Sequence, residues 1–477
     1  MSGKRPKVRL DPPRERRLAK TTLSPRELFP LPGSPITLET RIPALAADAH
    51  DALFRRTVET SGMPDDGPAR SLLRLVSCQP AGAARQRLLL DPLFIRYLHG
   101  LARFSTDARD WHDQTVGGCP ADSEAHNGHD DDSIAGNLIL PLILRAEPAW
   151  RGTLQLKTDG FGRLRFPTCD WSIDLRCSES SPPAVCVHHP VVVSLERRHF
   201  RWYRTDGDTT PFLVMARSDS MRMLARNDDR IEAGSLHCAD SLVRPKLHKA
   251  TPLGATGVCY DPIAFADEDH AAMTGGLVET VLAAMRLNSP VIHQEFCRYI
   301  RIVRGFEAPL SSYGIVQSFS DPSEPGVMGI NVSYTPDGYP RCQPCCFTCF
   351  GHELGHSKSY LIDSVAYEAG QRLAQNTSEW TEVIPRYGRR LRVRTLLQVP
   401  YTHLYELALL VEFVRNDFRG LEWSAAEDVN QIGEDLQQEI DDAFALIDEF
   451  ADLTAFGESV LEHLRRQFAH LQAKWAA

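Results

Sequence analysis

The sequence predicts an α+β fold, with a mixed N-terminal region and a mainly helical C-terminal region. Two observations support this prediction. Apolar residues recur at helical spacing on both sides of residues 150–260, and within this stretch apolar and polar residues alternate as they do in strands. A chain of 477 residues is also too long for one ordinary core, so we expect two domains or one large fold with extensions.

Composition places the protein among ordinary globular chains. Hydrophobic residues make up 43% and charged residues 24% of the sequence, and the net charge of -9 argues against nucleic acid as a partner. No run of about 18 apolar residues occurs, so no membrane span is expected. The N-terminus is basic with no apolar segment behind it, which is not the pattern of a secretory signal. We therefore expect a cytoplasmic protein.

The sequence divides into three regions. Residues 1–35 are rich in Pro, Lys and Arg and poor in large apolar residues, which predicts a basic flexible tail. Residues 36–260 form the mixed region, which is helical to about residue 110 and strand-rich from 150. Between these parts, residues 117–135 are rich in Gly, Asp, His and Asn, and we expect a mobile acidic loop there and no metal site. Residues 261–477 form the mainly helical region.

The elements expected in this last region follow from the spacing of its apolar residues. A helix is expected over residues 277–285 and a second over 291–303. Strands are expected over 313–319 and 327–334. The chain then ends in helices, where apolar residues from 432 to 447 form a stripe opposite a strongly acidic face. We interpret that acidic face as a solvated surface.

The segment His352-Glu353-Leu354-Gly355-His356 carries two histidines four residues apart. On a helix, residues at this spacing lie on one face about one turn apart, so both imidazoles can bind a single divalent ion. Pro344 and the apolar residues around the motif favour a helix at this place. The sequence therefore predicts an HExxH helix with a metal site, whose third ligand must come from another element.

Zinc peptidases carry the same motif and use its glutamate as general base, a role that Glu353 would take. The further ligands of two peptidase classes are missing here. Ile362 stands where one class needs a third histidine, and Gln375 and Asn376 stand where another class needs a glutamate. A zinc-dependent metallopeptidase stays open as the alternative function. The remaining candidate ligands for such an enzyme are Glu368, Glu379 and Glu382.

Four cysteines precede the motif, namely Cys342, Cys345, Cys346 and Cys349. Their spacing can hold zinc or an iron–sulfur cluster. However, Cys345 and Cys349 fall on the same helical stripe as the two histidines, which favours packing or lining of a pocket. A binding module built on a structural metal is a third interpretation, and the lack of four closely spaced ligands of standard pattern argues against it.

The residues that follow the motif extend the pattern. The stretch from His352 to Asp363, with Ser-Lys directly after the second histidine, resembles the iron- and 2-oxoglutarate-dependent HExxH-type peptide β-hydroxylases. Residues 304–310 and 392–413 are similar to that family as well, and the likeness covers about residues 270–420. Gly355 stands where the family often has Gln.

The resemblance implies a catalytic Fe(II) with 2-oxoglutarate as cosubstrate. His403 would be the third metal ligand, near the N-terminal end of a helix over residues 401–413 that packs on the HExxH helix. Arg394, or with less preference Arg392, would pair with the distal carboxylate of 2-oxoglutarate. Glu353 would orient an imidazole or a bound water. The rivals of His403 as third ligand are Glu406, Asp363 and Glu368.

The predicted function is hydroxylation of an unactivated carbon by an Fe(II)- and 2-oxoglutarate-dependent oxygenase. The residues are compatible with this chemistry, because three ligands on one face of Fe(II) leave two positions for the 2-oxo acid and one for O2. The resemblance implies a peptide or an amino-acid-derived molecule as the substrate.

Overall fold

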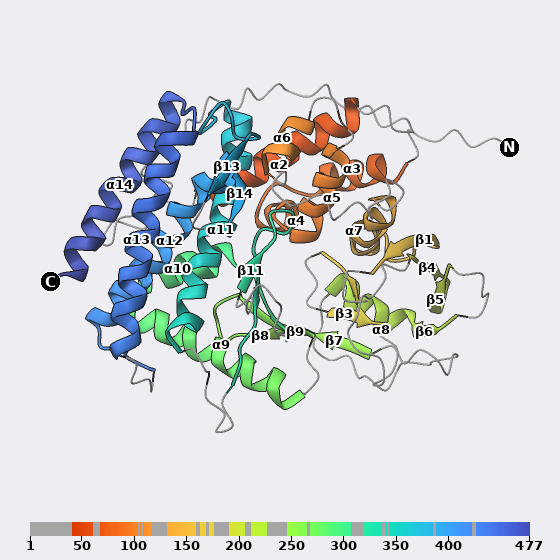
Figure 1. Cartoon of the computed structure of the whole chain (residues 1–477). Coiled ribbons are helices and arrows are strands. Elements are labelled where there is room, and N and C mark those ends of the chain that lie inside the picture. Colours follow the sequence, from red (N-terminus) through yellow and green to blue (C-terminus); the bar gives the residue numbers. More distant parts are fainter. Residues whose placement is uncertain are drawn as a thin grey trace.

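The computed structural model describes residues 41–60, 67–103, 105, 108–115, 131–158, 163–167, 171–175, 190–205, 211–226, 246–264, 268–306, 318–334, 340, 343–384, 388–421 and 426–477. The tail predicted at 1–35 and most of the loop predicted at 117–135 lie outside these residues. Helices α13 (Ala426–Phe450) and α14 (Ala455–Trp475) lie at one end of the molecule (Figure 1). The strand-rich segment lies at the opposite end, and the other helices lie between the two.

The N-terminal helices pack through aromatic and aliphatic side chains. The rings of Phe54 and Phe94 meet edge to face with their centroids 5.3 Å apart, and both side chains are fully buried. They share one hydrophobic core with the C-terminal helices. These helices are α2 (Arg41–Thr60), α3 (Pro68–Cys78), α4 (Ala83–Leu89), α5 (Pro92–Arg103), α6 (Arg109–Thr115) and α7 (Asp131–Ala146).

The strand-rich segment has a second core of its own. One sheet is antiparallel in the order β1-β4-β5-β6, and the other is antiparallel in the order β2-β3-β7. Val191, Val193 and Leu195 point inward at every second position, as the alternating pattern predicts. The elements are β1 (Gly152–Lys157), β2 (Arg163–Arg165), β3 (Trp171–Asp174), β4 (Pro190–Leu195), β5 (His199–Arg204), β6 (Leu213–Ala216), α8 (Arg217–Met221), the π-helical turn η3 (Arg222–Arg226) and β7 (Lys246–Lys249).

A five-stranded mixed sheet supports the C-terminal helices. Its order is β11-β12-β10-β9-β8, with β10 parallel to both β9 and β12 and with an antiparallel strand at each edge. Two helices make the crossover that parallel strands require, and they lead from β9 to β10. The elements are β8 (Thr251–Pro252), β9 (Cys259–Ala264), α9 (Glu268–Asn288), α10 (Pro290–Tyr299), β10 (Ile302–Phe306), β11 (Ser318–Ser320) and β12 (Val327–Ile330).

The C-terminal half is built around two long helices, α11 (Gln343–Ala369) and α12 (Val393–Arg415). A hairpin of β13 (Trp380–Ile384) and β14 (Arg389–Arg392) joins them. Helix α12 packs on α11 and also on α13 and α14, so it is buried on nearly every side. Apolar residues on all faces of its central turns explain this position.

Several sequence predictions are confirmed. Residues 277–285 form a buried stripe on α9, the stripe of α13 is buried from Leu436 to Ile447 with Ile432 partly buried, and the fold is of the α+β class. Helix α12 packs against α11, the HExxH helix, as expected. Among the residues that the structure describes, no helix is both long and apolar enough to cross a bilayer.

Several predicted boundaries are wrong, and the strand expected over 327–334 already ends at Ile330. The helix expected over 291–303 ends at Tyr299, because the following residues are largely β-branched and enter the buried strand β10. The loop expected to reach residue 135 gives way to α7 at Asp131, where acidic residues in the first turn favour a helix start. The helix expected to begin at residue 401 begins at Val393 and continues through Pro400, so His403 lies well inside the helix.

Candidate metal centre

Helix α11 presents both motif histidines on one face. On the other face of the helix, Phe347, Phe350 and Leu354 are fully buried in the core. This packing holds α11 in place and so sets the direction in which the histidines point. The Nε2 atoms of His352 and His356 lie 3.1 Å apart. Two ligands at about 2.1 Å from one ion, at a right angle to each other, are about 3.0 Å apart. The observed separation therefore fits two neighbouring ligands of a single ion.

Two glycines let α12 approach this part of α11 closely. A Cβ added at Gly355 would lie 2.8 Å from the Cα of Thr402, and one added at Gly351 would lie 2.8 Å from the backbone oxygen of Tyr405. Carbon atoms in ordinary contact are about 3.5–4.0 Å apart. Any larger residue at these positions would push the two helices apart, so the glycines keep α12 within reach of His352.

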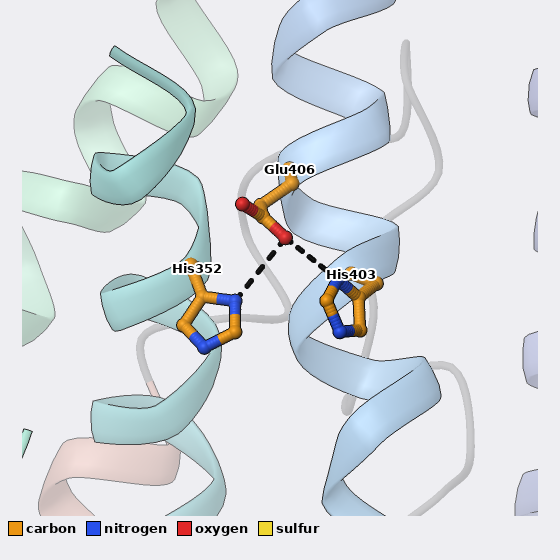
Figure 2. Close-up of side chains that lie close together, drawn as sticks. All are labelled: His352, His403 and Glu406. Atoms are coloured by element: carbon orange, nitrogen blue, oxygen red, sulfur yellow. Dashed lines mark hydrogen bonds and ion pairs between the residues drawn. The ribbon is translucent and has the colours of Figure 1, made fainter. Parts of the chain in front are cut away.

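Glu406 of α12 lies between His352 and His403 (Figure 2). Its Oε2 accepts from Nδ1 of His403 at 2.7 Å and from Nδ1 of His352 at 3.1 Å. Burial disfavours a charged imidazole, but the Glu406 carboxylate outweighs it and raises the pKa of His352 to about 9. Burial also opposes ionisation of Glu406, yet the two imidazoles lower the pKa of Glu406 to about 2. The carboxylate is therefore ionised at neutral pH and orients both rings.

Two sets of atoms on these residues can hold an ion. In the first set, the ligand atoms of His352, His403 and Glu406 all lie within 4.8 Å of one another. In the second set, the ion would bind to Nε2 atoms of His352, His356 and His403, and Glu406 would accept from the Nδ1–H groups of His352 and His403, as outer carboxylates commonly do at metal sites. The ring centroid of His352 lies 4.7 Å from that of His356 and 5.3 Å from that of His403. His352 thus lies beside both of the other predicted ligands, and Glu406 contacts His352 and His403, whereas the group within 4.8 Å does not include His356.

A third helix reaches the site through Glu439 of α13. Its Oε2 lies 3.4 Å from Nε2 of His403, so each ring nitrogen of His403 faces a carboxylate. The side chain of Glu439 is 31% exposed, compared with 26% for His352 and 12% for Glu406. Solvent therefore reaches these groups most freely beside α13. The sequence analysis did not single out Glu439, which remains partly exposed, as expected for the acidic face of α13, and also contacts His403.

Glu353 is almost completely buried, beside strand β11. Burial raises the pKa of its carboxyl group, although the neighbouring His352 opposes the shift. Its Oε2 has no hydrogen-bond partner among the described residues, and the same is true of the buried Nδ1 of His356. Burial, together with the charge of His352, also holds the pKa of His356 well below its ordinary value. The imidazole nitrogens and the Glu406 carboxylate are donors of the kind that transition-metal ions accept.

A cavity of about 70 Å³ begins at Ser359, one turn beyond His356 on α11, and Arg394 lines it. The Arg394 guanidinium donates to Asp363 Oδ2 at 3.0 Å and also to the backbone oxygen of Thr115. It lies 5.8 Å from the ring of Tyr360, which in turn stacks on His356. The Tyr360 ring therefore contacts both Arg394 and His356.

Arg392 is not part of this cavity. It lies at the end of β14, and its guanidinium carbon is 5.0 Å from the centre of the Trp380 ring. The sequence offered both arginines as partners for the distal carboxylate of 2-oxoglutarate, with a slight preference for Arg394, and the structure places them in different surroundings. Of the two, only Arg394 lines the cavity beside the HExxH helix.

No protein-family model matches this chain, and neither does any curated protein.

The other residues considered as third metal ligand, Asp363 and Glu368, are paired with arginines. Asp363 is paired with Arg394, and Glu368 Oε1 lies 2.5 Å from a guanidinium nitrogen of Arg56. Cys346 and Cys349 form no disulfide among the described residues, and burial raises the pKa of each thiol. This agrees with the packing role predicted for the cysteines. The side chains of Cys342 and Cys345 lie outside the described residues.

Proposed function

We propose that the chain is an Fe(II)- and 2-oxoglutarate-dependent oxygenase that hydroxylates an unactivated carbon of a peptide or amino-acid-derived substrate. The observation that carries this proposal is the alignment of His352, His356 and the Arg394 cavity along one side of α11. In this scheme His352, His356 and His403 hold the ion on one face and leave its other positions open.

The chain's own residues have separate roles in this scheme. Glu406 accepts from the Nδ1 atoms of His352 and His403 and so leaves their Nε2 atoms to the ion. Glu353 sits beside His352 and helps to orient the ligands or a bound water. With Fe(II) bound, 2-oxoglutarate loses CO2 and keeps one atom of O2 as succinate, and the other oxygen atom enters the substrate C–H bond.

In this scheme the distal end of a small dicarboxylate would enter the cavity, which begins one turn beyond His356. Its 70 Å³ is about half of the 150 Å³ cavity that takes benzene, so it accommodates a carboxylate group but no peptide. Burial raises the pKa of Asp363, although Arg394 opposes this shift. A second carboxylate that enters beside Arg394 would have to share the guanidinium with Asp363. The substrate itself would approach from the exposed side, beside Glu439.

The test is to add Fe(II) and then 2-oxoglutarate to the purified chain without oxygen. An oxygenase gives a visible charge-transfer band, and admission of O2 then yields succinate. Arg394→Met should weaken 2-oxoglutarate binding at least about tenfold, because a charge-assisted, two-pronged contact is lost. If no band and no succinate form with Fe(II), the proposal is wrong.

The second candidate is a zinc-dependent peptidase. It is favoured by the convergence of His352, His403 and Glu406, because two histidines and a glutamate are a common ligand set of catalytic zinc. Glu353 would then act as general base. Peptide cleavage with zinc in the absence of oxygen would favour this candidate over the oxygenase.

Two variants separate the two ligand sets. If the three imidazoles bind the ion, His356→Ala abolishes binding, and Glu406→Gln weakens it by about 10- to 100-fold, as expected for a group that orients ligands. If Glu406 is itself a ligand, Glu406→Gln loses the ion and His356→Ala keeps it. Metal content of the two purified variants decides between these sets.

A further inference from the structure

A buried ionic network lies on the far side of α11 from the motif histidines. Lys358 and Glu295 are both completely buried, and the Lys358 Nζ lies 2.7 Å from Glu295 Oε1. Lys358 also donates to the Tyr405 hydroxyl at 2.7 Å, and that hydroxyl donates to Glu295 Oε2 at 2.6 Å. The three polar groups therefore form a closed triangle, in which both carboxylate oxygens are used.

Aromatic rings complete the surroundings of the lysine. The Nζ lies 5.4 Å from the centre of the Tyr299 ring and 5.5 Å from that of Tyr405. Ring faces at this distance attract an ammonium group that has lost its water. Lys358 thus remains paired and enclosed, with no solvent-exposed surface of its own.

The network joins the two helices that carry the candidate ligands. Lys358 comes two residues after His356 on α11, and Tyr405 directly precedes Glu406 on α12. A shift of two residues turns a side chain to the other side of a helix. Glu295 of α10 holds Lys358 and Tyr405 together from that other side.

Apolar packing alone would fix the separation of these helices less closely. Apolar contacts are not directional, so by themselves they impose no defined angle between groups on the two helices. Hydrogen bonds to a buried ion pair have defined lengths and angles, and any movement that breaks them leaves a charge unpaired. The triangle therefore resists both sliding and separation of α11 and α12.

We propose that Lys358 is a positioning residue for the metal centre: with Glu295 and Tyr405, it fixes α12 against α11 at the separation that one ion requires. This inference rests on the proposed metal site. Metal–ligand distances tolerate changes of only about 0.2 Å, so a small movement of α12 is enough to weaken binding. Lys358 itself touches neither metal nor substrate in this scheme.

The test uses the full chain with Co(II) as the probe. Its dissociation constant is measured by competition with a chelator, and the visible spectrum of the loaded protein reports the number and geometry of ligands. The variants are Lys358→Met, Tyr405→Phe, and the double variant Lys358→Met with Glu295→Met, which leaves no unpaired charge if the single lysine variant does not fold. The control is Asn137→Leu, which removes buried hydrogen bonds to the backbone of Lys157 and Arg165, far along the chain from both helices.

We expect the lysine variants to bind Co(II) about 10- to 100-fold more weakly and with an altered spectrum, and Tyr405→Phe to lie between them and the wild type. Asn137→Leu should lower the thermal midpoint but leave affinity and spectrum unchanged. If the lysine variants matched Asn137→Leu in both Co(II) affinity and visible spectrum, Lys358 would have only a structural role, and the inference would be overturned. A wild-type chain that takes up no ion would instead overturn the metal centre itself, and the inference with it.

Discussion

Replacing Gly355 by alanine tests whether the close approach of α11 and α12 builds the metal site. The added Cβ would lie 2.8 Å from the Cα of Thr402, where ordinary contact needs about 3.5–4.0 Å. Backbone cannot rotate away as a side chain can, so α12 must move outward by about 1 Å. His403 and Glu406 lie on the same helix within four residues of Thr402, and they would move with it.

The effects on stability and on binding should differ in size. Overpacking lowers the free energy of unfolding by about 1–3 kcal/mol, and the better helix propensity of alanine offsets about 1 kcal/mol of this. The net loss of stability is therefore at most about 2 kcal/mol. A movement of about 1 Å is several times the tolerance of a metal–ligand distance, so metal affinity should fall at least about tenfold. Thermal unfolding of the metal-free chain and chelator competition measure these two quantities separately.

The matched control is Gly276→Ala on α9. This glycine is exposed and helical, and nothing lies within 4 Å of an added Cβ. The control should be stabilised by up to about 1 kcal/mol with no change in metal affinity. If Gly355→Ala bound the ion as tightly as the control does, the close contact between α11 and α12 would not be what positions the ligands.

Three further predictions concern single side chains. Glu353→Gln should leave measurable turnover of 2-oxoglutarate to succinate in an oxygenase, because an amide still forms hydrogen bonds. If the wild type instead cleaved peptides without oxygen and the variant lost all turnover, the peptidase would be favoured over the oxygenase. Glu439→Gln should weaken Co(II) binding by about tenfold, because a carboxylate beside His403 is neutralised; unchanged affinity would place Glu439 outside the site. Burial lowers the pKa of His50 to about 4, so the folded chain takes up this proton less readily than the unfolded one, and stability present above pH 6.5 is lost as the pH falls toward 4. Urea unfolding should show a loss of about 2 kcal/mol from His50 alone between pH 8 and pH 5, and His50→Phe should reduce this dependence.

Local spacing predicted the parts of the site that lie on one helix. His352 and His356 are separated by one turn, and the apolar residues around them are enough to indicate a helix. The stripe on α13 followed from the same reasoning. Such patterns depend only on the geometry of a single element, so one sequence contains all the information that they need.

The remaining parts depend on contacts between elements far apart in the chain. Glu406 was a rival ligand in the sequence, and only its place between two imidazoles gives it a role. Arg394 could not be ranked clearly above Arg392 until the cavity distinguished them. Glu439 had one weak signal, an acidic residue on the flank of the apolar stripe of α13, which is equally typical of a solvated helix surface.

Helix α12 is covered on its outer side by α13 and α14, and this has a consequence for how the protein can be shortened. The two helices α13 and α14 bury apolar side chains of α12, and α13 brings Glu439 to His403. A fragment that ended before α13 would leave the apolar outer surface of α12 in water, where it favours aggregation. The smallest fragment that keeps the surroundings of His403 intact therefore extends at least through α14.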